Sequence, residues 1–135
     1  MEWIVLSIAL FLVFVVLFVD FVLKKKRNLP LSLKRDVVQK WKKIENIADV
    51  HRQILEMDKL FDFILGKKGY QGTYADKLKT LQKTEKIDTE QLWYIHKKRN
   101  QVAHDVDVTI SKEDQKKMFI YGKESLRRLG INIYF

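Results

Sequence analysis

The chain opens on its longest hydrophobic stretch, an uncharged run of seventeen residues from Trp3 to Val19. The residues from Phe21 to Leu23 extend this run beyond Asp20. A helix rises ~1.5 Å per residue, so the segment is long enough to cross the ~30 Å hydrocarbon layer of a membrane. It also lacks the polar stripe that a helix of a soluble core shows. We therefore expect residues 1–23 to form a transmembrane anchor that contacts membrane lipid through residues 3–23.

The charges on either side of this segment favour an uncleaved anchor over a signal peptide. A signal peptide needs positive charge before the apolar run and a small-residue cleavage site after it. Here Glu2 precedes the run, and Lys24-Lys25-Lys26-Arg27 follows it. The positive-inside rule then predicts a single-pass protein of the cell membrane with its N-terminus outside and the remainder in the cytoplasm. The lack of cysteine fits a reducing compartment.

Apolar residues recur at helical spacing after a short basic linker at residues 24–31. Ser32 follows this linker and is the expected N-cap of the first helix of the bundle. The spacing predicts two apolar stripes, which consist of Val37, Val38, Trp41, Ile44 and Ala48 and of Ile47, Val50, Ile54, Met57, Phe61, Ile64 and Leu65.

Two further helices are predicted after the segment from Gly66 to Gly72, whose three glycines interrupt the pattern. Thr73 is the expected cap of a short helix from about Tyr74 to Leu81. Asp88, with Gln91 three residues later, resembles a capping box that opens the next helix. The inward-facing residues of that helix are expected to be Leu92, Ile95, Val102 and Ala103.

A last helix is predicted after the β-branched connector from Val106 to Ile110. Ser111 and Asp114 supply its cap, and Gly130 is its expected C′ residue. No stretch indicates a strand, so residues 32–135 are predicted to form an all-α, five-helix bundle behind the transmembrane helix. The hydrophobic residues 131–135 either pack on this bundle or touch the bilayer. The inward-facing residues of the last helix are Met118, Tyr121, Ser125, Leu126 and Leu129.

Positive charge is concentrated in the part of the chain that is expected to be cytoplasmic. All 26 lysines and arginines follow residue 23, whereas two of the 17 acidic residues precede it. Residues 24–135 therefore carry a formal net charge of +11. Such a charge favours polyanionic partners, and anionic lipid and nucleic acid both remain candidates.

The segment HKKRNQVAHD, from His96 to Asp105, combines residues that handle phosphate and protons. Arg99 offers a planar, permanently charged guanidinium, and His104 exchanges a proton near neutral pH. Asn100 can orient either partner. On an ideal helix Arg99 and His104 diverge by about 140°. They converge only if the helix ends near Ala103 or if the guanidinium swings round on its long stem.

These side chains suit the cleavage of RNA without a metal ion. An imidazole deprotonates the 2′-hydroxyl or protonates the leaving oxygen, and a guanidinium stabilises charge on the phosphorus oxygens. The histidines lack metal-ligand spacing and no glycine loop fits a P-loop, so we expect neither a metal nor a cofactor. The structural alternative is a basic helix end that complements its dipole, with His104 as a capping side chain.

The arrangement LWYIHKKRNQVAHD, Leu92 to Asp105, resembles the HEPN superfamily, whose hallmark is Arg, a polar residue, and then His after four to six intervening positions. The runs Met57 to Leu81 and Ser111 to Ile131 also resemble small HEPN-like proteins, so the resemblance covers roughly residues 33–131. It implies a helical bundle that often forms a homodimer with the motif helices facing each other. In many members it implies metal-independent RNA cleavage.

Carried over to this chain, the resemblance implies that Arg99 and His104 are the catalytic pair and that Asn100 orients them. His96, Lys97 and Lys98 are the candidate RNA contacts, although solvation or helix structure also explains them. Four aromatic residues either stack on bases or belong to the core, namely Trp41, Tyr70, Tyr74 and Trp93.

A non-enzymatic function is the alternative that the sequence leaves open. The domain would then be a membrane-tethered helical module that binds a protein partner or a nucleotide. An enzyme needs Arg99 and His104 in one open cleft. In a module the two side chains lie in separate surroundings or form structural contacts.

Overall fold

Six α-helices make up the protein in the computed structural model, which describes residues 1–85, 87–105 and 107–133. The described part of the chain contains no strand, so the all-α prediction is confirmed. In chain order the helices are α1 (Glu2–Arg27), α2 (Leu31–Glu45), α3 (Val50–Lys67), α4 (Tyr74–Glu85), α5 (Glu90–His104) and α6 (Lys112–Arg128).

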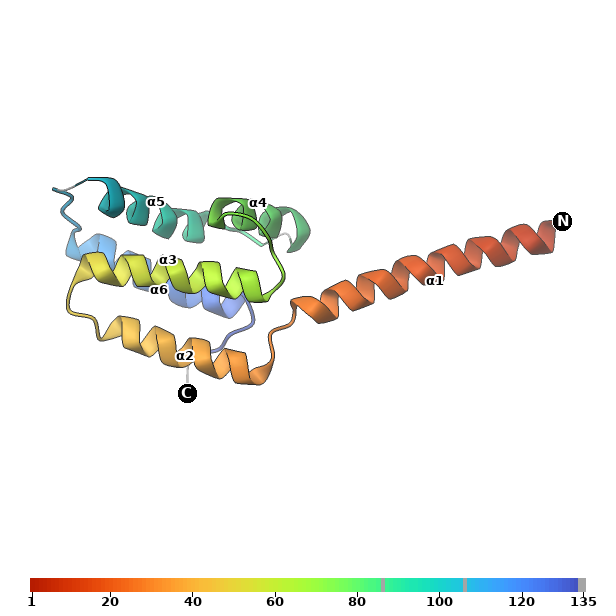
Figure 1. Ribbon diagram of the computed structural model, residues 1–135, viewed down its shortest axis with the longest axis horizontal. Coiled ribbons are helices and arrows are strands. Elements are labelled where there is room, and N and C mark those ends of the chain that lie inside the picture. The colour runs from red at the N-terminus through yellow and green to blue at the C-terminus, as the bar shows by residue number, and fades with distance from the viewer. Residues whose placement is uncertain (86, 106, 134–135) are drawn as a thin grey trace.

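Helix α1 projects from the bundle as a single rod (Figure 1). Its segment from Trp3 to Val22 is long and apolar enough to cross a membrane, and none of it is buried inside the protein. The helix continues through the basic residues as far as Arg27. Only three residues then separate it from α2, and Leu29 among them is just 7% exposed in the core. This leucine fixes the start of the bundle close to the end of α1.

Helix α3 is the central element of the bundle. It packs against α2, α4 and α5, and α5 packs in turn against α6 (Figure 1). The ring of Trp41 on α2 completes the core by lying edge-on to Phe61 of α3 and Phe119 of α6. The core thus closes without any residue of α1 from Trp3 to Val22.

The two predicted apolar stripes supply the parts of this core that come from α2 and most of those from α3. Every predicted stripe residue within α3 after Val50 is fully buried, and on α2 the same holds for Val37, Trp41 and Ile44. Two predictions are wrong, because Ala48 and Ala103 are exposed. Ala48 lies in the connection between α2 and α3, and Ala103 lies on the solvent side of the last turn of α5. Alanine is small enough to tolerate either environment, so its burial is a weak prediction.

The cap predictions at Thr73 and Ser111 are confirmed. Thr73 Oγ1 accepts from Asp76 N at 3.2 Å, and Ser111 Oγ accepts from Asp114 N at 3.0 Å. Gly130 has a φ of +81° after α6. There Ile131 N donates to Leu126 O at 2.9 Å, which ends the helix in a Schellman motif and buries Ile131. Residues 134–135 lie outside the described residues, as does Val106 of the predicted connector.

Two cap predictions are wrong. Pro30, not Ser32, precedes the first helical residue of α2, because its fixed φ of −64° suits a helix start and its carbonyl accepts from Lys34 N. At α5 the N-cap is Thr89 and not Asp88, although Asp88 accepts from Glu90 N at 2.9 Å, and Gln91 does not reach back. The side chain of Gln91 instead donates to Glu124 on α6.

Helix α6 packs tightly against the indole ring of Trp41 at Gly122. A side-chain carbon at this position would lie 2.3 Å from Cη2 of Trp41, which is 1% exposed and cannot move aside. The glycine is therefore required by the packing of the indole ring and not by the conformation of the backbone. Gly66 near the end of α3 offers a contrast, because a carbon there would meet only the flexible Lys77 Nζ at 3.5 Å.

We predict that Gly122→Ala lowers the free energy of unfolding by about 1–3 kcal/mol, the usual cost of overpacking a core. Gly66→Ala is the matched control, and it should be neutral or stabilising by up to ~1 kcal/mol because alanine favours the helix. Urea denaturation monitored by tryptophan fluorescence measures both. Equal stability of the two variants would contradict the close contact between Gly122 and Trp41.

Candidate functional site

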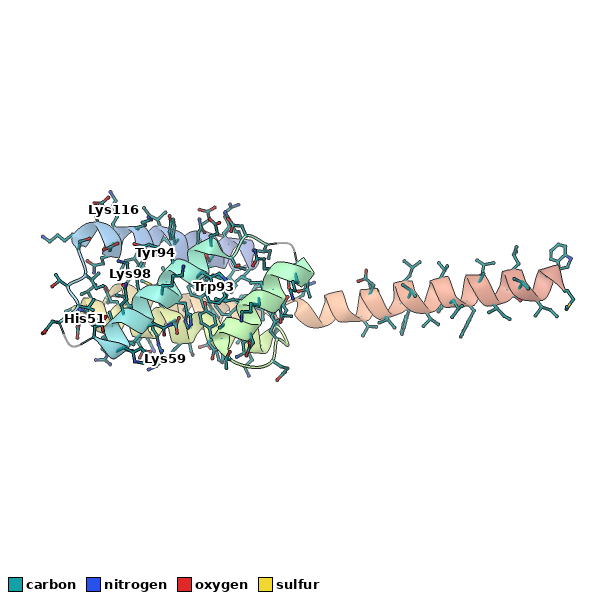
Figure 2. All side chains as sticks on the ribbon, turned by 90° about the horizontal axis from the view of Figure 1, so that it is seen from above. His51, Lys59, Trp93, Tyr94, Lys98 and Lys116 are labelled. Atoms are coloured by element: carbon teal, nitrogen blue, oxygen red, sulfur yellow. The ribbon has the colours of Figure 1, made fainter. Side chains whose placement is uncertain are left out.

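Helix α5 carries all the residues that the sequence suggests for RNA cleavage. It lies between α3 and α6, and the side chains of Trp93, Tyr94 and Lys98 project from it in Figure 2. Its apolar side is anchored by Leu92 and Ile95, which are buried as predicted. The polar residues that follow are therefore held in fixed directions by the packing of the first turns.

Two polar side chains of α5 contact a carboxylate that belongs to another helix. Asp58 of α3 is 6% exposed. Its Oδ1 lies 2.9 Å from Nδ1 of His96, and its Oδ2 lies 3.5 Å from Nε of Arg99. His96 and Arg99 are three residues apart, so they project from the same side of α5. One buried carboxylate thus connects α3 to two successive turns of α5.

Burial raises the pKa of Asp58, because the charged carboxylate loses its hydration. The hydrogen bond from His96 and the positive charge of Arg99 oppose this rise without cancelling it. The folded chain consequently holds this proton more tightly than the unfolded chain does. The contribution of Asp58 to stability therefore falls as the pH rises through the interval between its unfolded and folded pKa values.

Tyr74, the first residue of α4, encloses the same cluster. Its ring lies edge-on to His96 with 5.0 Å between ring centroids, and Trp93 flanks the imidazole in a similar way at 5.9 Å. The Tyr74 hydroxyl is buried and has no hydrogen-bond partner among the described residues. Burial, and next the charges of Asp58 and Asp62, raise the pKa of Tyr74 well above its ordinary value. The phenol therefore stays neutral at physiological pH.

Arg99 is held in place but remains accessible. Its side chain is 39% exposed, and besides the ion pair with Asp58 its Nη1 donates to Asn100 Oδ1 at 2.9 Å. Its Nη2 makes no hydrogen bond to a described residue. The hydrogen bond to Asn100 thus holds one side of the Arg99 guanidinium. The guanidinium is fixed on two sides and presents its remaining donors outward.

His104 lies apart from this cluster. Helix α5 is helical through His104, so Arg99 and His104 keep the helical divergence of about 140°. His104 is exposed and makes no side-chain hydrogen bond or ion pair with a described residue. The guanidinium of Arg99 turns toward Asp58 and Asn100. Within one copy of the chain, the two predicted catalytic residues therefore have different surroundings.

The candidate RNA contacts also occupy different environments. Lys97 is exposed. Lys98 pairs with Asp114 of α6 at 3.2 Å, and its ammonium lies over the ring of Tyr94. His96 is enclosed beside Asp58, with a side chain that is 15% exposed. Of the four aromatic residues, Trp41, Tyr70 and Tyr74 belong to the core, and Trp93 is half-buried.

Asp58 is the member of this cluster that sequence reasoning missed. Asp58 did leave a signal, because it lies four residues after Ile54 and three before Phe61, on a stripe that is otherwise apolar. A carboxylate at such a position is either exposed or paired. Tyr74 is among the aromatic residues expected either to stack on bases or to belong to the core, and it belongs to the core.

Among the described residues, no group of three or more His, Cys, Asp or Glu side chains is arranged to hold a metal ion. Comparison of the chain with protein-family models, with curated proteins and with solved structures finds no match in any of the three.

We predict that Asp58→Ala lowers the free energy of unfolding by about 1–3 kcal/mol, because it leaves the enclosed His96 ring without its hydrogen-bond partner. Asp62→Ala is the matched control. Asp62 pairs with Lys77 at 2.7 Å but is 43% exposed, so its loss should cost at most ~1 kcal/mol. Urea denaturation at neutral pH compares the two. If Asp58→Ala lowered the free energy of unfolding by less than Asp62→Ala does, the role of Asp58 in joining α3 to α5 would be contradicted.

Proposed function

We propose that this protein is a membrane-anchored ribonuclease that cleaves RNA without a metal ion. Helix α1 is its single-pass anchor, with the N-terminus outside and the bundle in the cytoplasm. Arg99, Asn100 and His104 on α5 are the reacting and orienting groups, in keeping with the resemblance of this segment to the HEPN superfamily.

The observation that carries the proposal is the preorganised guanidinium of Arg99. Asp58 holds Nε, and Asn100 holds Nη1, while Nη2 has no partner among the described residues. A guanidinium in this state binds a phosphate oxygen without first losing much side-chain freedom. The net charge of +11 on residues 24–135 adds a long-range attraction for a polyanion.

A second copy of the chain supplies the proton carrier in this proposal. His104 diverges from Arg99 on its own helix, but it is exposed at the helix end, where a facing α5 can approach. His104 of one copy then takes the proton from the 2′-hydroxyl of RNA bound to Arg99 of the other copy. The 2′-oxygen bonds to phosphorus, the bond from phosphorus to the 5′-oxygen breaks, and solvent protonates the leaving oxygen. The product is a 2′,3′-cyclic phosphate.

We predict that the full chain cuts single-stranded RNA in excess chelator, leaves a 2′,3′-cyclic phosphate and spares DNA of the same sequence. His104→Ala should lower the rate by ~10²- to 10⁴-fold, the usual effect of losing a positioned acid or base. Arg99→Lys should also lose its RNA-cleaving activity, because an ammonium cannot make the two-pronged contact with phosphate oxygens. The exposed Gln101→Ala and Arg127→Lys are controls that should keep activity.

Mixing the two inactive variants separates a shared site from a site within one chain. In a mixed dimer, intact Arg99 of the His104→Ala copy faces intact His104 of the Arg99→Lys copy, so one complete site is restored. Mixtures should therefore regain a substantial part of the lost activity. If either single variant kept its activity, or if the wild type cut no RNA, the proposed ribonuclease activity of this site would be refuted. Inactive single variants whose mixture stays inactive would refute the shared site.

The topology has a separate test, because the chain lacks cysteine and any introduced thiol is unique. We predict that an impermeant thiol reagent labels Glu2→Cys on intact cells and spares Gln101→Cys until the cells are lysed. The lysine and arginine residues that follow residue 23 are the reason for this direction. Labelling of position 101 on unbroken cells would reverse the proposed orientation.

One observation favours the non-enzymatic alternative, a tethered module that binds a protein or a nucleotide. The ion pair of Arg99 with Asp58 and the isolation of His104 are the separate surroundings expected of structural residues. In that case no chelator-resistant cleavage is detected. His104→Ala is then silent or alters only the binding of the partner.

A further inference from the structure

A groove lies at the end of the bundle that the chain enters from α1. It has a volume of about 580 Å³ and is formed by the first turns of α2 together with the turn that follows α6. The Schellman end of α6 brings that turn into place, because Ile131 is buried and its neighbours must follow the surface of α2. The lining residues are Leu31, Lys34, Arg35, Val38, Gln39, Gly130 and Asn132.

The chemistry of this groove suits an amphiphilic anion. Lys34 and Arg35 supply two positive charges, and none of the lining residues is acidic. Gly130 lies beside the ammonium, since a side-chain carbon there would be in van der Waals contact with Lys34 Nζ at 3.8 Å. The first turn of α2 also has no acidic residue, so its positive dipole end is not compensated locally. Apolar surface borders these charges, because Leu31 is 64% exposed.

The position of the groove identifies the anion. Leu31 is four residues beyond the end of α1 at Arg27, so its backbone lies within about 14 Å of that end. Leu29 is buried in the core and prevents the bundle from moving away on a long tether. The lining contains no aromatic side chain on which a nucleic-acid base could stack. The available anion at this distance is the headgroup of the bilayer that holds α1.

We infer that this groove binds the headgroup of an anionic phospholipid and thereby sets the bundle against the membrane surface. Lys34 and Arg35 contact the lipid phosphate, and Leu31 faces the acyl-chain side. The inference rests on the proposed role of α1 as an anchor, but not on the proposed cleavage of RNA.

The test uses the full chain in phosphatidylcholine nanodiscs, with a fluorophore on Gln39→Cys at the groove. A second sample carries the fluorophore on Gln101→Cys, on the last turn of α5. Phosphatidylglycerol with a nitroxide near the start of one acyl chain should quench position 39 more strongly than phosphatidylcholine with the same nitroxide. Position 101 should show no such preference.

Two charge-matched variants assign the preference to the groove. Lys34→Gln combined with Arg35→Gln should raise the mole fraction of phosphatidylglycerol needed for half-maximal quenching by about 5- to 30-fold, because each basic residue at an anionic surface contributes about fivefold. Lys112→Gln combined with Lys116→Gln removes the same charge from exposed residues of α6, where Lys116 lies at the far end of the bundle (Figure 2), and should change little.

Several results would overturn the inference. Equal quenching by both lipids, or an equal loss in the two double variants, would show that the groove does not select the lipid. If excess inorganic phosphate abolished the preference while chloride at equal ionic strength did not, the groove would be a site for free phosphate. A chain that does not enter nanodiscs would overturn the anchor and this inference with it. None of these outcomes depends on RNA cleavage.

Discussion

The buried carboxylate of Asp58 is the interaction on which both the packing of α5 and the geometry of the candidate site depend. A carboxylate in this position needs partners, since burial without them would cost several kcal/mol. His96 and Arg99 satisfy it from one side of α5, which fixes the rotation of that helix against α3. The same contacts direct Arg99 away from His104. The need to pair the buried Asp58 thus determines that Arg99 and His104 do not meet within one chain.

This separation makes the membrane relevant to the chemistry that we propose. If Arg99 and His104 work together only between two copies, then the concentration of copies limits the reaction. In the topology that we propose, α1 confines the bundles to a thin layer and raises their effective concentration without adding any contact between them. A weak interface along α5 is then sufficient for two copies to meet. Ala103 and His104 are exposed, which leaves the last turn of α5 accessible to a second copy.

The sequence predicted the features that depend on local chemistry. The stripes on α2 and α3, the hydroxyl caps at Thr73 and Ser111 and the glycine after α6 all follow from spacing and backbone preference. It failed where a partner from a distant segment decides the outcome. Gln91 leaves its expected cap for Glu124, thirty-three residues away, and Asp58 joins α5 across thirty-eight. Helical spacing shows that Asp58 lies on an apolar face, but it cannot show which helix covers that face.

The proposed lipid groove must face the membrane, whereas the proposed RNA site on α5 must face away from it. The fold satisfies both requirements. The lipid groove is at the start of α2, beside the end of α1, whereas the last turn of α5 lies at the other end of the bundle (Figure 1). A bundle held by its groove against the headgroups therefore directs His104 and the exposed side of Arg99 away from the bilayer. RNA is repelled by an anionic membrane, and that repulsion is screened beyond ~8 Å at physiological salt. The length of the helices places α5's last turn beyond this layer, since the fifteen residues of α2 alone span about 22 Å.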